Sequence, residues 1–323
     1  MNLTPESFAT TLQQIRQQVG RILLGQDETI DGVLIGILAR GHVLIEGVPG
    51  LGKTLLVRAL SRVLGCSQKR IQFTPDLMPS DVTGGNVFDQ RQGAFVFHPG
   101  PIFAQLVLAD EINRAPAKTQ ASLLEAMADR SVTSDGVTRA LPDPFFVIAT
   151  QNPVESQGTY PLPEAQLDRF LLKLEIVHPT AAVEKSILQA YVAGFDASDL
   201  DAAGIRQIVG AADVSAMQRY LLGVRVDEEI MNYITEIVGR TRNHRSVFLG
   251  ASPRASIALL TTARAQAAIE GRTFVVPDDV KALAPAVLRH RLILHPDAEF
   301  EGITADQCID QILGAVHVPK SAA

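Results

Sequence analysis

A glycine-rich turn that ends in lysine and threonine carries the clearest chemistry in this sequence. Its glycines allow backbone N–H groups to close around phosphates, and the helix expected after it adds a favourable dipole. Lys53 would reach the β- and γ-phosphates of a nucleotide, and the Thr54 hydroxyl would ligate Mg²⁺. The spacing therefore predicts an ATP- and Mg²⁺-binding loop made of Gly47, Val48, Pro49, Gly50, Leu51, Gly52, Lys53, Thr54 and Leu55.

An apolar run of strand length, 106–109, leads directly into Asp110 and Glu111. Asp110 would hold the hydration shell of Mg²⁺, and Glu111 could polarise the attacking water, which indicates hydrolysis rather than binding alone. An Asp-Glu pair at a strand end could also be a solvated turn. The phosphate loop upstream favours the nucleotide interpretation.

A third polar group, Asn152, follows the apolar run 145–150. Its amide could hydrogen-bond the γ-phosphate or the attacking water. Asn before Pro153 is also an ordinary turn device. Its place at the end of another predicted strand favours a role in the site.

Five apolar runs supply the strands that would position these groups. Continuous runs suit parallel strands buried on both faces, and helical stretches between them predict an open α/β sheet with ligands at the carboxyl ends of the strands. Two hairpins, 86–97 and 131–140, interrupt the pattern. They are either plain surface hairpins or partner-contact loops. The runs are 42–46, 70–74, 106–110, 145–150 and 170–177.

The composition changes after Pro179, and the rest of the chain reads as mostly helical. We therefore predict two domains, an α/β nucleotide-binding core over residues 1–179 and a helical domain over residues 180–323. The basic string 289–291 is expected to be a solvated helix end rather than a nucleic-acid patch, given the acidic total.

The bulk composition predicts a soluble, folded protein. The chain has 323 residues, of which 46% are hydrophobic and 20% charged, with a net charge of −6 and two cysteines. These values argue against disorder, against a generic polyanion binder and against a disulfide framework. The first 20 residues lack the apolar core of a signal peptide, and the window 30–48 contains too many charges to span a bilayer. We expect a cytoplasmic protein with no membrane insertion and no nucleic-acid partner.

The order of these motifs resembles the AAA+ ATPase family. Asp110 and Glu111 look like its Walker B motif, and Asn152 looks like its sensor 1. The stretch 162–170 looks like the segment that carries the arginine finger, with Arg169 as the finger, and 251–255 looks like sensor 2, with Arg254 opening a lid helix. From spacing alone, Asp168 and Arg169 would be an ordinary surface ion pair.

Three phrases, 74–81, 109–115 and 149–153, look like the MoxR branch of that family. The resemblance implies a P-loop AAA+ core with a five-stranded parallel sheet and two β-hairpin inserts, followed by a smaller all-α lid domain. It implies a ring, commonly a hexamer, in which ATP lies between the core and lid of one subunit and Arg169 enters from the next. It also implies that Thr74 or Gln72 restrains Glu111.

Members of this branch look like chaperone-type motors. They work with a von Willebrand factor A domain protein and activate a protein client, for example by inserting a metal or cofactor. Three alternatives remain open at this point. One is a magnesium-chelatase-like motor subunit, another is an AAA+ protein acting on DNA, and the third is a nucleotide-gated scaffold with little hydrolysis. The presence of both Glu111 and Arg169 argues against the scaffold.

Overall fold

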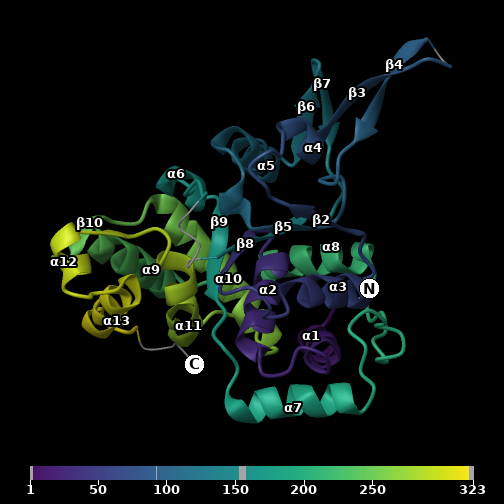
Figure 1. Cartoon of the computed structure of the whole chain (residues 1–323). Helices are drawn as coiled ribbons and strands as arrows, with labels where there is room; N and C mark the ends of the chain where they lie inside the picture. The colour runs from purple at the N-terminus through teal and green to yellow at the C-terminus, as the bar shows by residue number, and fades with distance from the viewer. Residues whose placement is uncertain (1–2, 92, 153–157, 320–323) are drawn as a thin grey trace.

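A five-stranded parallel sheet forms the centre of the first half of the chain (Figure 1). The computed structural model describes residues 3–91, 93–152 and 158–319. The strand order is β2-β5-β8-β1-β9, so the strand before the glycine-rich turn lies inside the sheet, between β8 and β9. The predicted parallel sheet is confirmed, with β1 at His42–Glu46, β2 at Gln68–Gln72, β5 at Leu106–Asp110, β8 at Phe146–Gln151 and β9 at Phe170–Glu175.

The outermost strand β2 differs from the expectation of burial on both faces. Residues 68–70 are exposed, and only Ile71 is fully buried. The prediction is wrong for this strand because β2 pairs with β5 alone and forms one edge of the sheet. Its polar side chains are therefore free to reach the carboxyl end of the neighbouring strand β5.

Helices cover the sheet and begin with strong local signals. The first helix starts with a capping box, in which Ser7 N donates to Thr4 Oγ1 at 3.2 Å and Thr4 N donates to Ser7 Oγ at 2.9 Å. Its apolar stripe, which includes Phe8, Leu12 and Ile15, is buried in the main core. The helices of the first half are α1 at Pro5–Gly20, α2 at Asp27–Leu38, α3 at Lys53–Leu64, α4 at Pro79–Thr83, α5 at Ala117–Asp129 and α6 at Glu164–Leu167, with a 3-10 turn η1 at Ile112–Arg114.

Both predicted hairpins are present, and they project together from one end of the molecule (Figure 1). The first pairs β3 at Gly84–Asp89 with β4 at Ala94–Pro99, and the second pairs β6 at Ser131–Ser134 with β7 at Val137–Ala140. Asn86 Nδ2 donates to Asp135 Oδ2 at 2.6 Å, and the Arg139 guanidinium lies 3.7 Å from the centre of the Phe97 ring. The two hairpins therefore support each other.

The second half is helical, as predicted, and adds a small two-stranded ribbon between β10 and β11. One helix of this half, α10, packs against α1, α2, α9 and α11, and one buried apolar cluster spans both halves. The division at residue 179 therefore stays a prediction. No helix among the described residues is both long and apolar enough to cross a membrane. The elements are α7 at Ala181–Val192, α8 at Ala211–Tyr220, η2 at Leu221–Gly223, α9 at Glu228–Thr241, β10 at Val247–Leu249, α10 at Pro253–Ile269, α11 at Pro277–Leu288, β11 at Ile293–Leu294, α12 at Pro296–Phe300 and α13 at Ala305–Ala315.

The basic residues that follow α11 are not solvated, which corrects the sequence-based expectation. The His290 Nε2 atom lies 3.0 Å from the Phe170 carbonyl oxygen, and Arg291 Nη2 donates to the same oxygen at 2.7 Å. The Arg291 side chain is only 4% exposed. The helix end lies on strand β9, where the backbone supplies acceptors, and this contact fastens the second half of the chain to the sheet.

Candidate functional site

The glycine-rich turn joins β1 to α3 and has a backbone that its glycines make possible. Gly50 and Gly52 have φ angles of +87° and +81°, in the left-handed region that other residues rarely adopt. A Cβ atom on Gly47 would lie 2.8 Å from the Ile176 carbonyl oxygen. Strand, turn and helix therefore have the context that the phosphate-loop pattern requires.

Lys53 and Thr54 open α3 and face a cleft of about 470 Å³. The Lys53 ammonium donates to the Gly47 carbonyl oxygen across the mouth of the loop. Burial lowers the pKa of Lys53, and the nearby carboxylates of Asp110 and Glu111 oppose that shift.

The cleft brings together the residues that the motifs predicted separately. Its walls include Lys53, Thr54, Asp110, Glu111 and Asn152. They meet because β1, β5 and β8 are neighbours in a parallel sheet, so the ends of these strands lie at one edge. Every other residue of the predicted loop except Val48 also lines this cleft or the adjoining cavity, and Pro153 lies outside the described residues.

Thr150, which sequence reasoning missed, orders the two acidic residues. Its hydroxyl donates to Asp110 Oδ1 at 2.6 Å and accepts from the Glu111 backbone N–H at 2.9 Å. Glu111 itself has φ and ψ angles of 56° and 51°, a left-handed conformation that costs free energy in a non-glycine residue. This backbone conformation ends the strand at Asp110 and leaves the Glu111 side chain in the wall of the cleft.

Two arginines and a glutamine surround the acidic pair, and we call Arg70, Gln72, Asp110, Glu111 and Arg114 the cleft cluster. Arg70 donates to Asp110 Oδ2 through Nε at 3.1 Å and Nη2 at 2.6 Å. Gln72 Nε2 and Arg114 Nη1 donate to Glu111 Oε2 at 2.8 and 2.9 Å. The sequence signal for Arg70 was the alternation of polar and apolar residues over 70–74, which the sequence analysis treated as a continuous apolar run.

Of the two residues predicted to restrain Glu111, Thr74 and Gln72, only Gln72 is seen to contact its carboxylate. Gln72 reaches the Glu111 carboxylate, whereas the Thr74 hydroxyl bonds to Asp76 and lowers the pKa of that exposed carboxyl. The strand register gives the reason, because Gln72 is paired with Asp110 and therefore stands beside the acidic pair.

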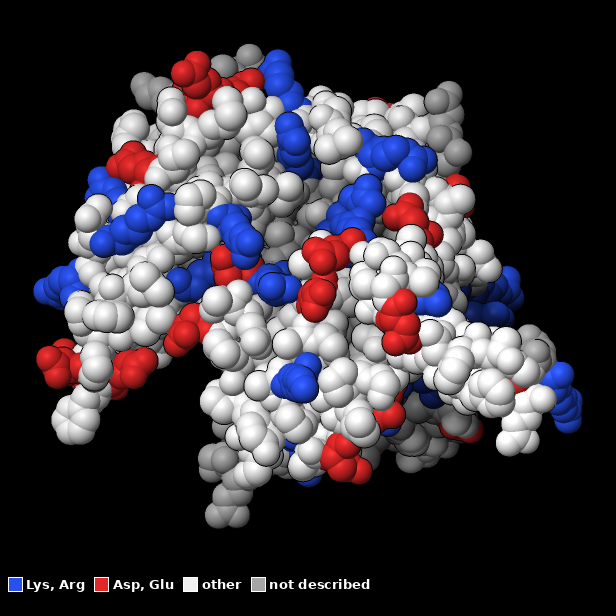
Figure 2. Space-filling view, turned by 90° about the horizontal axis from the view of Figure 1, so that it is seen from above, with Lys and Arg blue, Asp and Glu red and all other residues white. Residues whose placement is uncertain are grey.

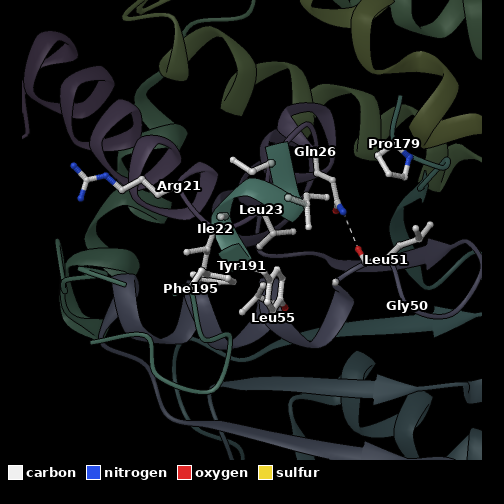
Figure 3. A pocket seen from close by; sticks show the side chains of 14 residues that line it. Arg21, Ile22, Leu23, Gln26, Gly50, Leu51, Leu55, Pro179, Tyr191 and Phe195 are labelled. Atoms are coloured by element: carbon white, nitrogen blue, oxygen red, sulfur yellow. Dashed lines mark hydrogen bonds between the residues drawn. The ribbon is translucent and has the colours of Figure 1, made fainter. Parts of the chain in front are cut away.

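An apolar cavity of about 190 Å³ adjoins the polar cleft (Figure 3). Its walls are formed by Ile22, Leu23, Leu55 of α3, Tyr191 of α7 and Phe195, which follows α7. At its edge, Gln26 Nε2 donates to the Leu51 carbonyl oxygen at 2.7 Å. Tyr191 lines both spaces. A polar cleft joined to an apolar cavity suits a ligand with a charged tail and a flat ring.

The wall formed by α7 and the segment after it is fastened to α3. Arg58 also lines the cleft, and it donates to the Ala197 and Ser198 carbonyl oxygens at 2.9 and 2.7 Å. Arg62 forms an ion pair with Asp201. The two arginines lie one helical turn apart, so a single face of α3 holds this segment over the site.

Arg169 and Arg254 are not among the residues that line the cleft. Both are exposed, and both stand beside Asp168, which we group with Ser252, Arg254 and Arg291 as the Asp168 cluster. Arg169 Nη1 donates to the Leu124 carbonyl oxygen at 2.6 Å. Tyr191 and Ala197, from the second half of the chain, line the cleft, whereas Arg254 begins α10 at the Asp168 turn. The roles of Arg169 and Arg254 toward ATP stay predictions.

The residues present fit a magnesium ion. The cleft offers the Thr54 hydroxyl and the Asp110 carboxylate, and hard oxygen ligands of this kind, few in number and completed by water and phosphate, are typical of Mg²⁺ sites in nucleotide enzymes.

Comparisons with known proteins agree with this site. Residues 42–172 match the ATPase family associated with various cellular activities (AAA), and residues 239–312 match the AAA lid domain. The chain is 41% identical to Chaperone MoxR1 of Mycobacterium tuberculosis over 96% of its own length and 83% of that protein. It is 50% identical to the uncharacterized protein YeaC of Bacillus subtilis over 97% of both chains.

A solved structure extends the likeness to three dimensions. The crystal structure of a protein from Cytophaga hutchinsonii, described as a candidate ATPase, matches with a TM-score of 0.90 and 39% identity over 98% of this chain and 97% of that one. Fold, site and sequence relatives therefore agree, and the chain belongs to the MoxR family of AAA+ ATPases.

Proposed function

We propose that this protein hydrolyses ATP at a site completed between neighbouring subunits of a ring, and that it uses this turnover to remodel or activate a protein client. The observation that carries the proposal is the cleft that unites Lys53, Thr54, Asp110, Glu111 and Asn152. The phosphates would occupy this cleft, and the adenine ring would enter the apolar cavity between Ile22 and Tyr191.

Within the cleft, each residue has a distinct task. The loop amides and the Lys53 ammonium would bind the β- and γ-phosphates, and Glu111 would accept the proton of the attacking water as a general base. Asn152 would hydrogen-bond the γ-phosphate or that water. Mg²⁺ held at Thr54 and Asp110 would neutralise charge on the phosphates.

A ring is proposed because the two remaining arginines stand outside the cleft. Arg169 and Arg254 are exposed and do not line the cleft of their own subunit, so we infer that they act on a nucleotide bound by another copy of the chain. We propose a hexamer in which Arg169 is the finger and Arg254 acts beside it on the same neighbouring ATP.

A protein client and a von Willebrand factor A domain partner are proposed rather than a nucleic acid. The relative named MoxR1 is a chaperone by name, and the first hairpin exposes an edge-to-face aromatic pair, Phe88 and Phe95. On the face of the described residues shown in Figure 2, acidic and basic side chains are intermingled, whereas polyanion binding favours one continuous basic field.

The test is ATP turnover per chain, measured with Mg²⁺ over a range of protein concentrations, beside a Lys53→Ala variant. We expect turnover per chain to rise with concentration in parallel with assembly, followed by light scattering. Lys53→Ala should lose nucleotide binding at least a hundredfold, about 3 kcal/mol, because a charge-assisted phosphate contact is removed. Retained affinity in that variant, or full turnover in a monomer, would contradict the proposal.

A further inference from the structure

An unbroken path of side-chain hydrogen bonds leads from Asp110 to Glu111 through β2. Arg70 donates to Asp110 Oδ2, and its Nη2 also donates to Gln72 Oε1. Gln72 in turn donates through Nε2 to Glu111 Oε2 at 2.8 Å. Arg70 therefore contacts both the carboxylate proposed for the metal ion and the amide that holds the proposed base.

Strand geometry explains why Arg70 and Gln72 act on one side. Successive side chains of a strand point to opposite faces, so residues 70 and 72 share a face while Lys69 points away from it. Arg70 is paired with Leu108 and Gln72 with Asp110 across β5, which brings both polar side chains to its carboxyl end. Both residues line the same cleft as Lys53.

The ion pair between Arg70 and Asp110 is exposed enough for a ligand to replace Arg70 at the Asp110 carboxylate. The Arg70 side chain is 50% exposed and that of Asp110 is 16% exposed, so the pair contributes only a modest free energy. A divalent cation and a guanidinium are both attracted to the Asp110 carboxylate and repel each other. Arg70 also lines the space proposed for the phosphates, so another anionic partner is within its reach.

We propose that Arg70 is a positioning residue that couples occupancy of Asp110 to the restraint on Glu111, an inference that rests on the ATP site proposed above. While Arg70 is paired with Asp110, it fixes Gln72, and Gln72 holds Glu111. When Asp110 turns to the metal ion that accompanies ATP, Arg70 loses its carboxylate partner. Gln72 then loses its fixed neighbour, and Glu111 is released for the reaction.

The first experiment measures binding rather than turnover. The dissociation constant of a fluorescent, non-hydrolysable ATP analogue is determined in EDTA and in Mg²⁺. The value in EDTA divided by the value in Mg²⁺ measures how strongly the metal ion increases nucleotide affinity. In Arg70→Ala, Asp110 is no longer occupied by a competing cation. We therefore expect the ratio to increase roughly three- to tenfold over that of the natural chain.

Two further variants serve as matched controls. Lys69→Ala removes the same charge from the opposite face of the same strand, and its ratio should equal that of the natural chain. Arg70→Lys keeps a cation near Asp110 but lacks the fork that also reaches Gln72. It should therefore keep a ratio close to that of the natural chain and still lose the link to Glu111.

The link itself is tested by a double-mutant cycle on the same binding ratio. Gln72→Ala should raise the binding ratio, because Arg70 loses one of its two partners and is displaced from Asp110 more easily. The double variant Arg70→Ala/Gln72→Ala should have the ratio of Arg70→Ala alone, and in an Arg70→Lys background Gln72→Ala should leave the ratio unchanged. Independent, multiplying effects of Arg70→Ala and Gln72→Ala would overturn the coupling.

The binding ratio also separates this inference from the proposed function. If the natural chain fails to bind the analogue in either condition, the ATP site itself is wrong, and the coupling falls with it. If the natural chain binds but Arg70→Ala has an unchanged ratio, or loses affinity equally in EDTA and Mg²⁺, then Arg70 is a spectator or a simple phosphate ligand, and the coupling alone is overturned.

Discussion

Two arginine–carboxylate clusters in this protein use similar groups in different environments. In the cleft cluster, the arginines at positions 70 and 114 are 50% and 40% exposed, and Arg70 lines the open cleft. In the Asp168 cluster, Arg291 is almost fully buried, and its Nε donates to Asp168 Oδ1 at 2.7 Å. Arg291 also donates to the carbonyl oxygens of Phe170 and Leu171.

The difference indicates what each cluster can do. A half-exposed pair is held by a small free energy, so an incoming ligand can replace one partner. A buried arginine whose donors all have acceptors cannot leave without a desolvated carboxylate remaining behind. The first arrangement suits a site that changes with its ligand, and the second suits a permanent contact that fixes Asp168, the carboxylate that Arg254 also faces.

The largest expected effect comes from Arg169, the exposed arginine next to Asp168. Arg169→Ala should bind ATP normally and lose about 10³-fold or more in turnover, because an arginine supplied by a neighbour stabilises the charge that develops on the phosphates. Rings mixed with Glu111→Gln subunits, which keep Arg169 but lack the base, should regain part of the activity. No rescue at any mixing ratio would count against a finger acting between subunits.

The buried arginine should act on stability instead. Arg291→Met keeps the length of the side chain but leaves Asp168 without its buried partner, which should cost about 3–5 kcal/mol. Urea unfolding followed by circular dichroism measures this loss. A variant as stable as the natural chain would show that the Arg291–Asp168 pair does not stabilise the fold.

A buried neutral histidine extends the comparison to pH. His42 Nδ1 accepts from the Val147 N–H at 3.0 Å, and Nε2 lies 3.1 Å from the Met127 carbonyl oxygen. Burial is the main cause that lowers the pKa of His42 from 6.5 to about 4. Between these pH values the unfolded chain binds more protons, so this contribution is present above pH 6.5 and is lost as the pH falls toward 4.

The size of this effect is about 3 kcal/mol, as follows from the shift of the pKa. Urea unfolding at a series of pH values from 7 to 4 should show it as a steeper loss of stability in the natural chain than in His42→Gln, which cannot take up the proton. Parallel pH profiles in the two proteins would exclude His42 as the cause.

The smallest expected change in stability belongs to Arg254, which shares Asp168 with Arg291. Its side chain is 67% exposed, and its Nη1 lies 3.7 Å from Asp168 Oδ2, so Arg254→Ala should change the free energy of unfolding by less than about 1 kcal/mol. Turnover of the assembled protein should nevertheless fall. A large loss of stability would instead show that Arg254, like Arg291, stabilises the fold through Asp168.

The sequence by itself determined the phosphate loop, the acidic pair and the alternation of strand and helix. These features are local: Gly50 and Gly52 make a turn that few other residues allow, and the run 106–109 is short, apolar and followed by two acidic residues, as suits a buried strand. Asn152 was also identified, because the end of a predicted strand is defined by the chain itself. The resemblance to the MoxR branch added Arg169 and Arg254 as candidate members of the site, and for these two residues the role stays a prediction.

Only the tertiary structure decided which groups meet across the sheet and which do not. Strand order and register place Arg70, Gln72 and Thr150 beside the acidic pair, and no spacing along the chain contains that information. The burial of Arg291 has the same origin, since the end of α11 becomes buried only when it lies on β9. Contacts between distant segments depend on packing, so the exchangeable cleft cluster and the fixed Asp168 cluster could be told apart only in the folded chain.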